Sequence, residues 1–117
     1  IDSFNTHIGF KAAGQHTTAK NNVAIGNSAL FINSIKSGLV AVGDSALYSN
    51  GVGAVNPGEG EFNTAIGFRT LRNNQIGFNN TALGNNALYY NIAGGSNTAI
   101  GNLSLYNNVS KTGNTAV

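Results

Sequence analysis

The stretch Asn97-Thr98-Ala99-Ile100-Gly101 is one copy of a pattern that recurs along almost the whole chain. Each clear copy is followed by a leucine and then by an asparagine, so the full template reads N-T-A-I-G-x-x-A-L-x-x-N. The copies that begin at Asn63 and Asn80 follow this template closely. A pattern that returns at a fixed interval is the sequence signature of a repeat architecture. The length of that interval therefore decides the fold class.

The glycine of each copy measures the interval. It occurs at Gly9, Gly26, Gly43, Gly67, Gly84 and Gly101, so the spacing is 17 residues except for one interval of 24. The extra seven residues predict an insertion at 51–61, where four glycines and the only proline cluster. Residues 1–21 form a degenerate first coil, as terminal repeats often do. Residues 22–117 carry the regular repeats and end on an unfinished copy, so we expect the array to continue in a longer protein.

A 17-residue unit is too short for helical-hairpin repeats, whose units exceed about 30 residues. It suits one coil of a parallel β-solenoid, in which coils stack about 4.8 Å apart. Thr-Ala-Ile favours a short strand, and the glycine after it favours a corner with positive φ or a close backbone approach. The second segment, such as 85–91, favours a strand or an irregular turn, with a single helical turn as the alternative. The predicted fold class is all-β: a parallel β-solenoid of 17-residue coils.

Stacking of equal coils places equivalent residues in columns. Two apolar columns are predicted to form the core, with the isoleucine position of the strand facing inward. These columns are Ile8, Ile25, Val42, Ile66, Leu83 and Ile100 in one case, and Leu30, Leu47, Leu71, Leu88 and Leu105 in the other. Corner asparagines form a third column, which we expect to hydrogen-bond between coils and to tolerate left-handed backbone. Its members are Asn33, Asn50, Asn74, Asn91 and Asn108.

The predicted core is thin, because each coil supplies few large apolar side chains. Small alanines at template positions three and eight favour close approach of neighbouring coils. We therefore expect additional burial between chains, in a homotrimer about a long axis.

Composition narrows the function further. Only 9% of the residues are charged, against about 25% in typical proteins, and the six basic residues are scattered, so nucleic acid is not an expected partner. No apolar run approaches the roughly 20 residues of a membrane span, so no membrane insertion is expected. The absence of cysteine excludes disulfides and thiol chemistry.

The titratable residues do not predict catalysis. His7 and His16, with Asp2 nearby in sequence, form no recognisable catalytic grouping, and we interpret the histidines as surface residues. Glu59 and Glu61, together with Asp44, could gather a cation near the insertion. Calcium usually requires more oxygen ligands than two loop glutamates supply, so we expect no metal, no cofactor and no enzymatic activity.

One surface feature is a candidate for binding. Aromatic residues occupy the same template position in four coils, and Arg72 lies between them in the sequence. They are Phe31, Tyr48, Tyr89 and Tyr106. Aromatic rows can stack against sugar rings or a partner surface, or they can pack between chains or over the neighbouring coil. The 51–61 insertion, with Glu59 and Glu61, is the second candidate, because insertions in solenoids often gather on a binding face.

A column of threonines gives a third interpretation. Thr6, Thr64, Thr81, Thr98 and Thr115 are equivalent, and regular threonine rows occur in ice-binding solenoids. Val23 and Val40 interrupt this column, and each strand holds only one threonine. Ice binding is therefore the least favoured of the three functions considered.

The repeated template resembles repeat segments of phage and giant-virus tail-fibre proteins, which often precede an intramolecular-chaperone domain. It is also similar in style to the head repeats of trimeric autotransporter adhesins, whose coils are shorter. The resemblance covers nearly all of residues 5–117. It implies a non-enzymatic segment of an extracellular trimeric fibre, on a virion or a bacterial surface, that spaces or displays a host-binding region. An adhesin or receptor-binding head, with a cell-surface glycan or protein as partner, is the alternative.

Overall fold

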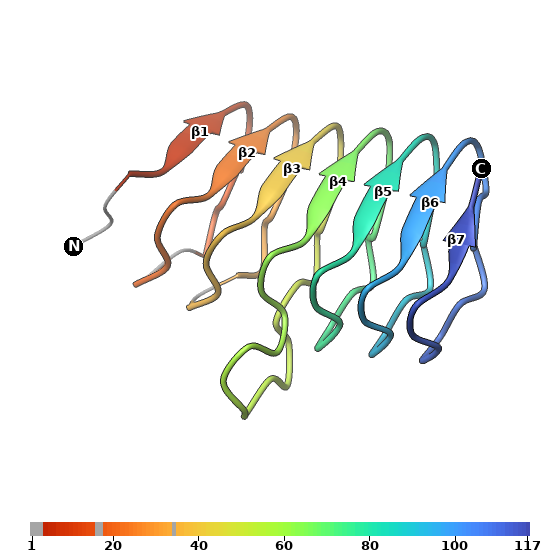
Figure 1. Cartoon of the computed structure of the whole chain (residues 1–117). Helices are drawn as coiled ribbons and strands as arrows, with labels where there is room; N and C mark the ends of the chain where they lie inside the picture. The colour runs from red at the N-terminus through yellow and green to blue at the C-terminus, as the bar shows by residue number, and fades with distance from the viewer. Residues whose placement is uncertain (1–3, 16–17, 34) are drawn as a thin grey trace.

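The computed structural model describes residues 4–15, 18–33 and 35–117. It is a parallel β-solenoid in which one short strand per coil stacks into a single sheet of seven strands, in sequence order (Figure 1). The strands are β1 (Thr6–Ile8), β2 (Val23–Ile25), β3 (Val40–Val42), β4 (Thr64–Ile66), β5 (Thr81–Leu83), β6 (Thr98–Ile100) and β7 (Thr115–Ala116). The described residues contain no helix, so the all-β prediction is confirmed.

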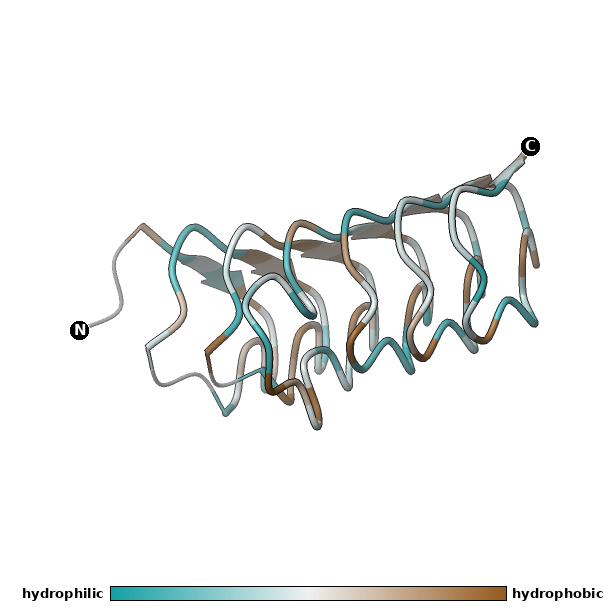
Figure 2. Ribbon diagram, turned by 60° about the horizontal axis from the view of Figure 1, so that its bottom comes forward, coloured by the Kyte–Doolittle hydropathy of each residue, from teal (hydrophilic) through white to brown (hydrophobic). Residues whose placement is uncertain are grey.

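The strands pair in parallel without any register shift between equivalent template positions. Ala65 pairs with Ala82, and Ala82 pairs with Ala99, 17 residues further on. The strands lie along one side of the solenoid and the returning segments of the coils along the other (Figure 2). The principal extents are 37 × 28 × 18 Å, so the solenoid is a short, flat rod with little interior depth.

The recurring glycine forms a tight corner directly after each strand. Gly84 has a φ of +131°, and a Cβ built on it would lie 2.6 Å from the Gly101 carbonyl oxygen of the next coil. Positive φ of this size is tolerated almost only by glycine. The position therefore requires glycine for two reasons, the backbone angle and the close approach of stacked coils.

The second segment of each coil is an irregular turn, neither a strand nor a helical turn. Its central leucines adopt left-handed backbone, with φ between 49° and 52° at Leu30, Leu47, Leu71, Leu88 and Leu105. Left-handed backbone is uncommon for bulky residues, and stacking compensates for it here. The Leu88 amide donates to the Ser104 carbonyl of the next coil at 2.9 Å. Sequence patterns predicted left-handed backbone at the corner asparagines, whereas the structure places it at the leucines.

The core consists of alanines from the strands and of alanines and leucines from the turns. Ala65, Ala82 and Ala99 are fully or almost fully buried, as are Leu30, Leu47, Leu71 and Leu88. Leu105 is partly buried and packs against them. Strand alanine and turn leucine face each other across the flat interior, and the small alanine leaves the space that the leucine fills.

The prediction that the isoleucine column faces inward is wrong. Side chains alternate between the two faces of a strand, and the single inward position is taken by alanine. Ile66, Leu83 and Ile100 are about 40% exposed, and Ile25 and Val42 are half-buried. The alanines at template positions three and eight are correspondingly inside the coils.

Two ladders of buried asparagines connect the coils. In the corner column, Asn91 Nδ2 donates to Asn74 Oδ1 at 2.9 Å and to the Gly94 carbonyl at 2.8 Å. Asn108 Nδ2 continues the ladder by donating to Asn91 Oδ1 at 3.0 Å. Asn33, at the other end of the column, donates to the Lys36 carbonyl at 2.9 Å. Buried polar groups stabilise a fold only when they are hydrogen-bonded, and the side chains from Asn50 to Asn108 meet that condition through their neighbours.

The second ladder uses the asparagine that opens every template copy except the third, which opens with Leu39. Sequence analysis had assigned this asparagine no role. Asn80 Oδ1 accepts the backbone N–H of Asn97 at 3.0 Å, and Asn80 Nδ2 donates to the Gly94 carbonyl at 2.8 Å. Asn63, one coil earlier, accepts the N–H of Asn80 in the same way. The recurrence of this asparagine in register in the other copies was the available signal, because a surface asparagine would not need to recur in this way.

The insertion leaves the solenoid without disturbing the coils on either side. Asn74 Nδ2 bonds to the carbonyl three residues later, whereas the equivalent bond of Asn50 reaches Gly60, ten residues later. The difference is the seven extra residues. Gly51 and Gly60 both donate to the next coil, to the carbonyls of Gln75 and Ile76. The residues between them, 52–59, project as a separate lobe, here called the insertion loop (Figure 1).

Candidate functional site

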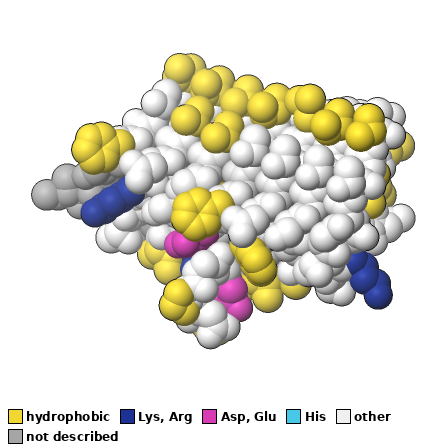
Figure 3. Space-filling view, viewed as in Figure 1, with side chains coloured by type: hydrophobic (Ala, Val, Ile, Leu, Met, Phe, Trp, Pro, Cys, Tyr) yellow, Lys and Arg dark blue, Asp and Glu magenta, His cyan; other side chains and the backbone are white. Residues whose placement is uncertain are grey.

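The outward side of the seven strands, here called the strand face, is uncharged and regular. It carries the isoleucine column described above and a second column of Thr6, Val23, Val40, Thr64, Thr81, Thr98 and Thr115. Figure 3 shows hydrophobic side chains in a row along one edge of this face over the whole length of the solenoid. None of the seven strands contains Lys, Arg, Asp or Glu. The strand face is thus a continuous, partly apolar surface in contact with solvent.

The predicted aromatic residues do come together, in a column that also includes Arg72. Phe31 and Tyr48 lie with ring centroids 5.4 Å apart, and the Arg72 guanidinium lies 4.8 Å from the Tyr48 centroid. Tyr89 and Tyr106 stack nearly parallel, 16° and 5.3 Å apart. We call these five residues the aromatic column. Two pairs of rings, Phe31 with Tyr48 and Tyr89 with Tyr106, therefore pack against each other over neighbouring coils, as the alternative interpretation expected.

Tyr90 adds a ring with a different orientation, which sequence reasoning missed. Its ring stands at 81° to Tyr89 and at 84° to Tyr106, with centroids 4.7 and 5.2 Å away. The stacked pair can therefore cover at most one face of Tyr90, and 42% of the residue is exposed. Desolvation, followed by interactions with Tyr90 that include a side-chain hydrogen bond, raises the pKa of Tyr106 above its ordinary value. The signal in the sequence was the Tyr89-Tyr90 pair at adjacent template positions.

Basic residues line the same surface. Arg69 is exposed and lies 4.7 Å from the Phe68 ring centroid. Lys11 lies 5.9 Å from the Phe31 centroid at the other end. The nearest acid is Asp44, whose pKa is lowered mainly by hydrogen bonds from Ser45 and Asn27 and, to a smaller extent, by the charges of Arg69 and Arg72. Three cations and one carboxylate therefore accompany the aromatic column.

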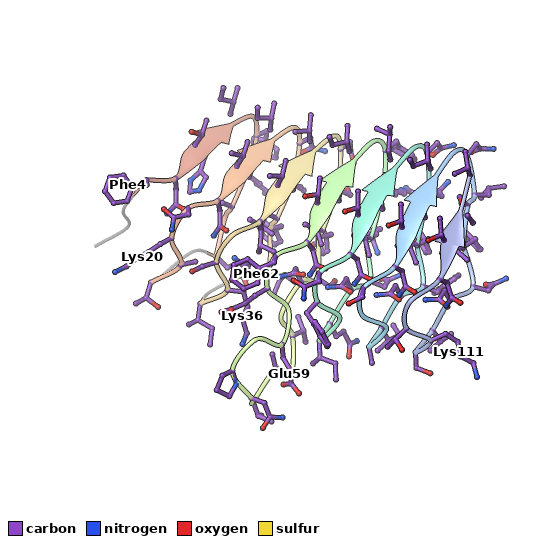
Figure 4. The ribbon with its side chains drawn as sticks, viewed as in Figure 1. Phe4, Lys20, Lys36, Glu59, Phe62 and Lys111 are labelled. Atoms are coloured by element: carbon purple, nitrogen blue, oxygen red, sulfur yellow. The ribbon has the colours of Figure 1, made fainter. Side chains whose placement is uncertain are left out.

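The insertion loop is held in shape by Glu59. Its Oε2 accepts the backbone N–H groups of Val55 at 2.8 Å and Asn56 at 2.9 Å, and its Oε1 accepts Asn56 Nδ2 at 2.8 Å. Figure 4 places Glu59 on the loop and Phe62 and Lys36 near its base. Both carboxylate oxygens accept hydrogen bonds within the loop, so Glu59 fixes the geometry of the loop.

The described residues around the loop offer few groups for a metal or a small molecule. Among the described residues, no group of three or more His, Cys, Asp or Glu side chains is placed to hold a metal ion. Asp44, Glu59 and Glu61 therefore do not gather as a cation site. A shallow hollow of about 120 Å³ lies between Pro57, Glu59 and Phe78, well below the roughly 300–1,000 Å³ of small-molecule pockets.

Lowering the pH is expected to loosen the insertion loop. Hydrogen bonds from the Asn56 side chain and then from the backbone lower the pKa of Glu59 below its ordinary 4.5. Because the pKa of Glu59 is lower in the folded state, its carboxylate stabilises the folded loop fully above pH 4.5. This stabilisation is lost as the pH falls through the folded-state pKa. Hydrogen exchange of the Val55 and Asn56 amides should accelerate several-fold in that range, after correction for intrinsic rates.

Glu59→Gln should remove this pH dependence and leave the loop loosened at neutral pH. Glu61→Gln is the matched control and should retain the transition. If Glu61→Gln abolished the pH-dependent change in hydrogen exchange and Glu59→Gln kept it, Glu59 would not be the residue that holds the loop.

His7 is the one histidine among the described residues. His7 lies in β1 at the template position that alanine occupies in β2–β6. His16 and Asp2 lie outside the described residues.

Comparison with protein-family models, curated proteins and solved structures finds no match for this chain. The described part of the chain includes no helix with the length and hydropathy needed to cross a bilayer.

Proposed function

We propose that this chain is a non-enzymatic structural segment of an extracellular trimeric fibre, of the kind found in phage tail fibres, that spaces or displays a host-binding region. The observation that carries the proposal is the strand face. It presents a row of aliphatic side chains to solvent on every complete coil, from Ile8 to Ile100. Uninterrupted exposed apolar surface of this kind usually marks a protein interface.

A second copy of the same chain is the partner that fits this face best. Its rows repeat at the same coil rise, so side chains of two parallel copies remain in step along the whole length. The face lacks charged residues, so identical copies do not repel each other. Three copies with their strand faces turned to a common axis would bury the isoleucine column and the threonine–valine column of each copy. This burial would supplement the thin alanine–leucine core.

Solution mass tests the proposal. The wild-type chain should have a mass about three times its 12.0 kDa by light scattering. Ile66→Lys combined with Ile100→Lys should raise the dissociation constant at least about a hundredfold, since about 2.7 kcal/mol would be lost, while circular dichroism stays unchanged. Val109→Lys is the control, because Val109 is 51% exposed but outside the strands. A wild-type monomer would contradict the trimer.

The other two functions have specific tests. Ice binding would use the same strand face, with its threonine and valine rows, and thermal hysteresis by a wild-type monomer would favour it over the fibre. An adhesin or receptor-binding head is favoured by a separate observation, the aromatic column with its basic residues. The chemistry of that surface identifies a class of ligand.

A further inference from the structure

We propose that the surface formed by Tyr89, Tyr90, Tyr106, Arg69 and Arg72 binds an acidic carbohydrate chain. This surface carries aromatic rings and cations on the turn side of the coils, whereas the strand face carries neither. The inference is therefore independent of trimer formation.

Aromatic rings provide the first part of the argument. Sugar rings have apolar C–H faces that pack on the faces of aromatic side chains, and aromatic residues with a polar tip suit partly wet binding surfaces. Tyr90 has at least one face that the stacked pair of Tyr89 and Tyr106 does not cover. The pair supports Tyr90 from one side, so its ring is held in place before a ligand arrives, which lowers the entropic cost of binding.

The arginines provide the second part. Arg72 has one face on the Tyr48 ring and donates to Asn73 Oδ1 at 3.4 Å. A guanidinium has five N–H donors, and no other hydrogen bond of Arg72 to a described residue occupies the rest. Arg69 lies on Phe68 and is close enough for its charge to act on Tyr106. Two guanidinium groups fixed on rings are suited to bidentate binding of carboxylates or sulfates.

The distribution of charge favours an acidic ligand over a neutral one. Arg69 and Arg72 belong to this surface, and Lys11 lies at the other end of the aromatic column. Among the described acids, Asp44 lies near the two arginines. Asp44 is already engaged by Asn27, at 2.9 Å, and by Ser45. A net positive surface in a chain with few charges attracts anions.

The geometry of the repeat favours a chain of sugars over a single sugar. Residues 72, 89 and 106 are equivalent positions on successive coils, joined by bonds from the Asn73 amide to the Tyr89 carbonyl and from the Tyr90 amide to the Tyr106 carbonyl. Successive positions are therefore about 4.8 Å apart. A pyranose unit of an extended polysaccharide advances by a similar distance, so consecutive sugars can meet consecutive coils.

Calorimetry with oligogalacturonate and with its neutral methyl ester tests the inference. The wild-type chain should bind the acidic oligomer, and the methyl ester should bind at least about tenfold more weakly, a difference of about 1.4 kcal/mol. Added salt should weaken binding of the acidic form and leave the ester almost unaffected. Equal affinity for both oligomers, or binding of neither, would overturn the proposal.

Variants separate the site from general electrostatic attraction. Arg69→Gln, Arg72→Gln and Tyr90→Ala should each weaken binding about tenfold with unchanged circular dichroism. Arg69 and Tyr90 are exposed, so at least these two variants should fold normally. Lys20→Gln removes an exposed cation near the opposite end of the solenoid (Figure 4) and should have little effect. If Lys20→Gln weakened binding as much as Arg69→Gln, the attraction would be general and these residues would not form a specific site.

The Ile66→Lys, Ile100→Lys double variant should bind the acidic oligomer normally. This result distinguishes failure of the carbohydrate proposal from failure of the trimer proposal.

Discussion

Gly84→Val is expected to destabilise the chain by at least about 4 kcal/mol, a loss of the size that marks a specific structural conflict. Gly84 has a φ of +131°, and an added Cβ would lie 2.6 Å from the Gly101 carbonyl oxygen and 2.7 Å from its carbon. Neither atom can move aside, because the Gly101 backbone is itself bonded to the same coil, through its N–H to the Leu83 carbonyl at 2.8 Å. Valine, branched at Cβ, also cannot adopt this backbone angle without strain. Chemical denaturation followed by circular dichroism measures the loss.

Two control variants divide this loss into its causes. Gly101→Val has nearly the same backbone angle, +123°, but an added Cβ meets nothing within 4 Å, so it should cost only the backbone strain of about 1–3 kcal/mol. Asn85→Val changes the exposed neighbouring residue and loses one exposed hydrogen bond to Asn102, which is worth about 1 kcal/mol. The loss of stability should therefore be largest for Gly84→Val, smaller for Gly101→Val and smallest for Asn85→Val. Equal losses at Gly84 and Asn85 would contradict the role of the glycine corner.

The features that depend on period could be predicted from the sequence. A parallel stack requires equivalent residues to recur in register, so the interval of 17 residues determined the coil and the extra seven residues located the insertion. The glycine corner and the corner asparagine column belong to the same class, because a backbone angle or a buried hydrogen bond favours one residue type at equivalent positions of successive coils. The aromatic column could likewise be read from one template position.

The direction of the strand side chains could not be read from the same pattern. Alternation places Thr and Ile on one side of a strand and Ala on the other, but it does not say which side is inside. Hydrophobicity favours burying isoleucine, and that reasoning gave the wrong face. The deciding factor is the depth of the coil, which is set by the turn segment. Leucines in left-handed conformation, such as Leu88 with a φ of 50°, fill the interior and leave room only for alanine opposite.

Outward isoleucines and inward alanines together support the proposal that several chains assemble into the stable unit. Each of the strands β2–β6 buries an alanine methyl group inside and leaves a larger aliphatic side chain outside. Burial contributes in proportion to apolar area, so most of the apolar area of the strands remains unused in one copy. The same inversion that corrected the core therefore strengthens the case for assembly and places the proposed interface at the isoleucine column.

Leu88→Ala and Leu83→Ala test this inversion directly, since the sequence predicted both leucines to be core residues. Leu88 is fully buried in the alanine–leucine core, and truncation of such a residue typically costs 2–5 kcal/mol. The alanine keeps a Cβ at the same positive φ, so the loss reports the cavity and not a change in backbone strain. Leu83 is 44% exposed, and its truncation should cost about 1 kcal/mol or less within one chain.

Denaturation at several protein concentrations separates the two positions further. The loss in Leu88→Ala should be the same at every concentration, because the cavity lies inside one coil. The loss in Leu83→Ala should grow with concentration if copies associate through the strand face, because the assembled state then contributes to stability by mass action. Equal, concentration-independent losses of several kcal/mol at both positions would restore the isoleucine column to the core and remove the basis for assembly through the strand face.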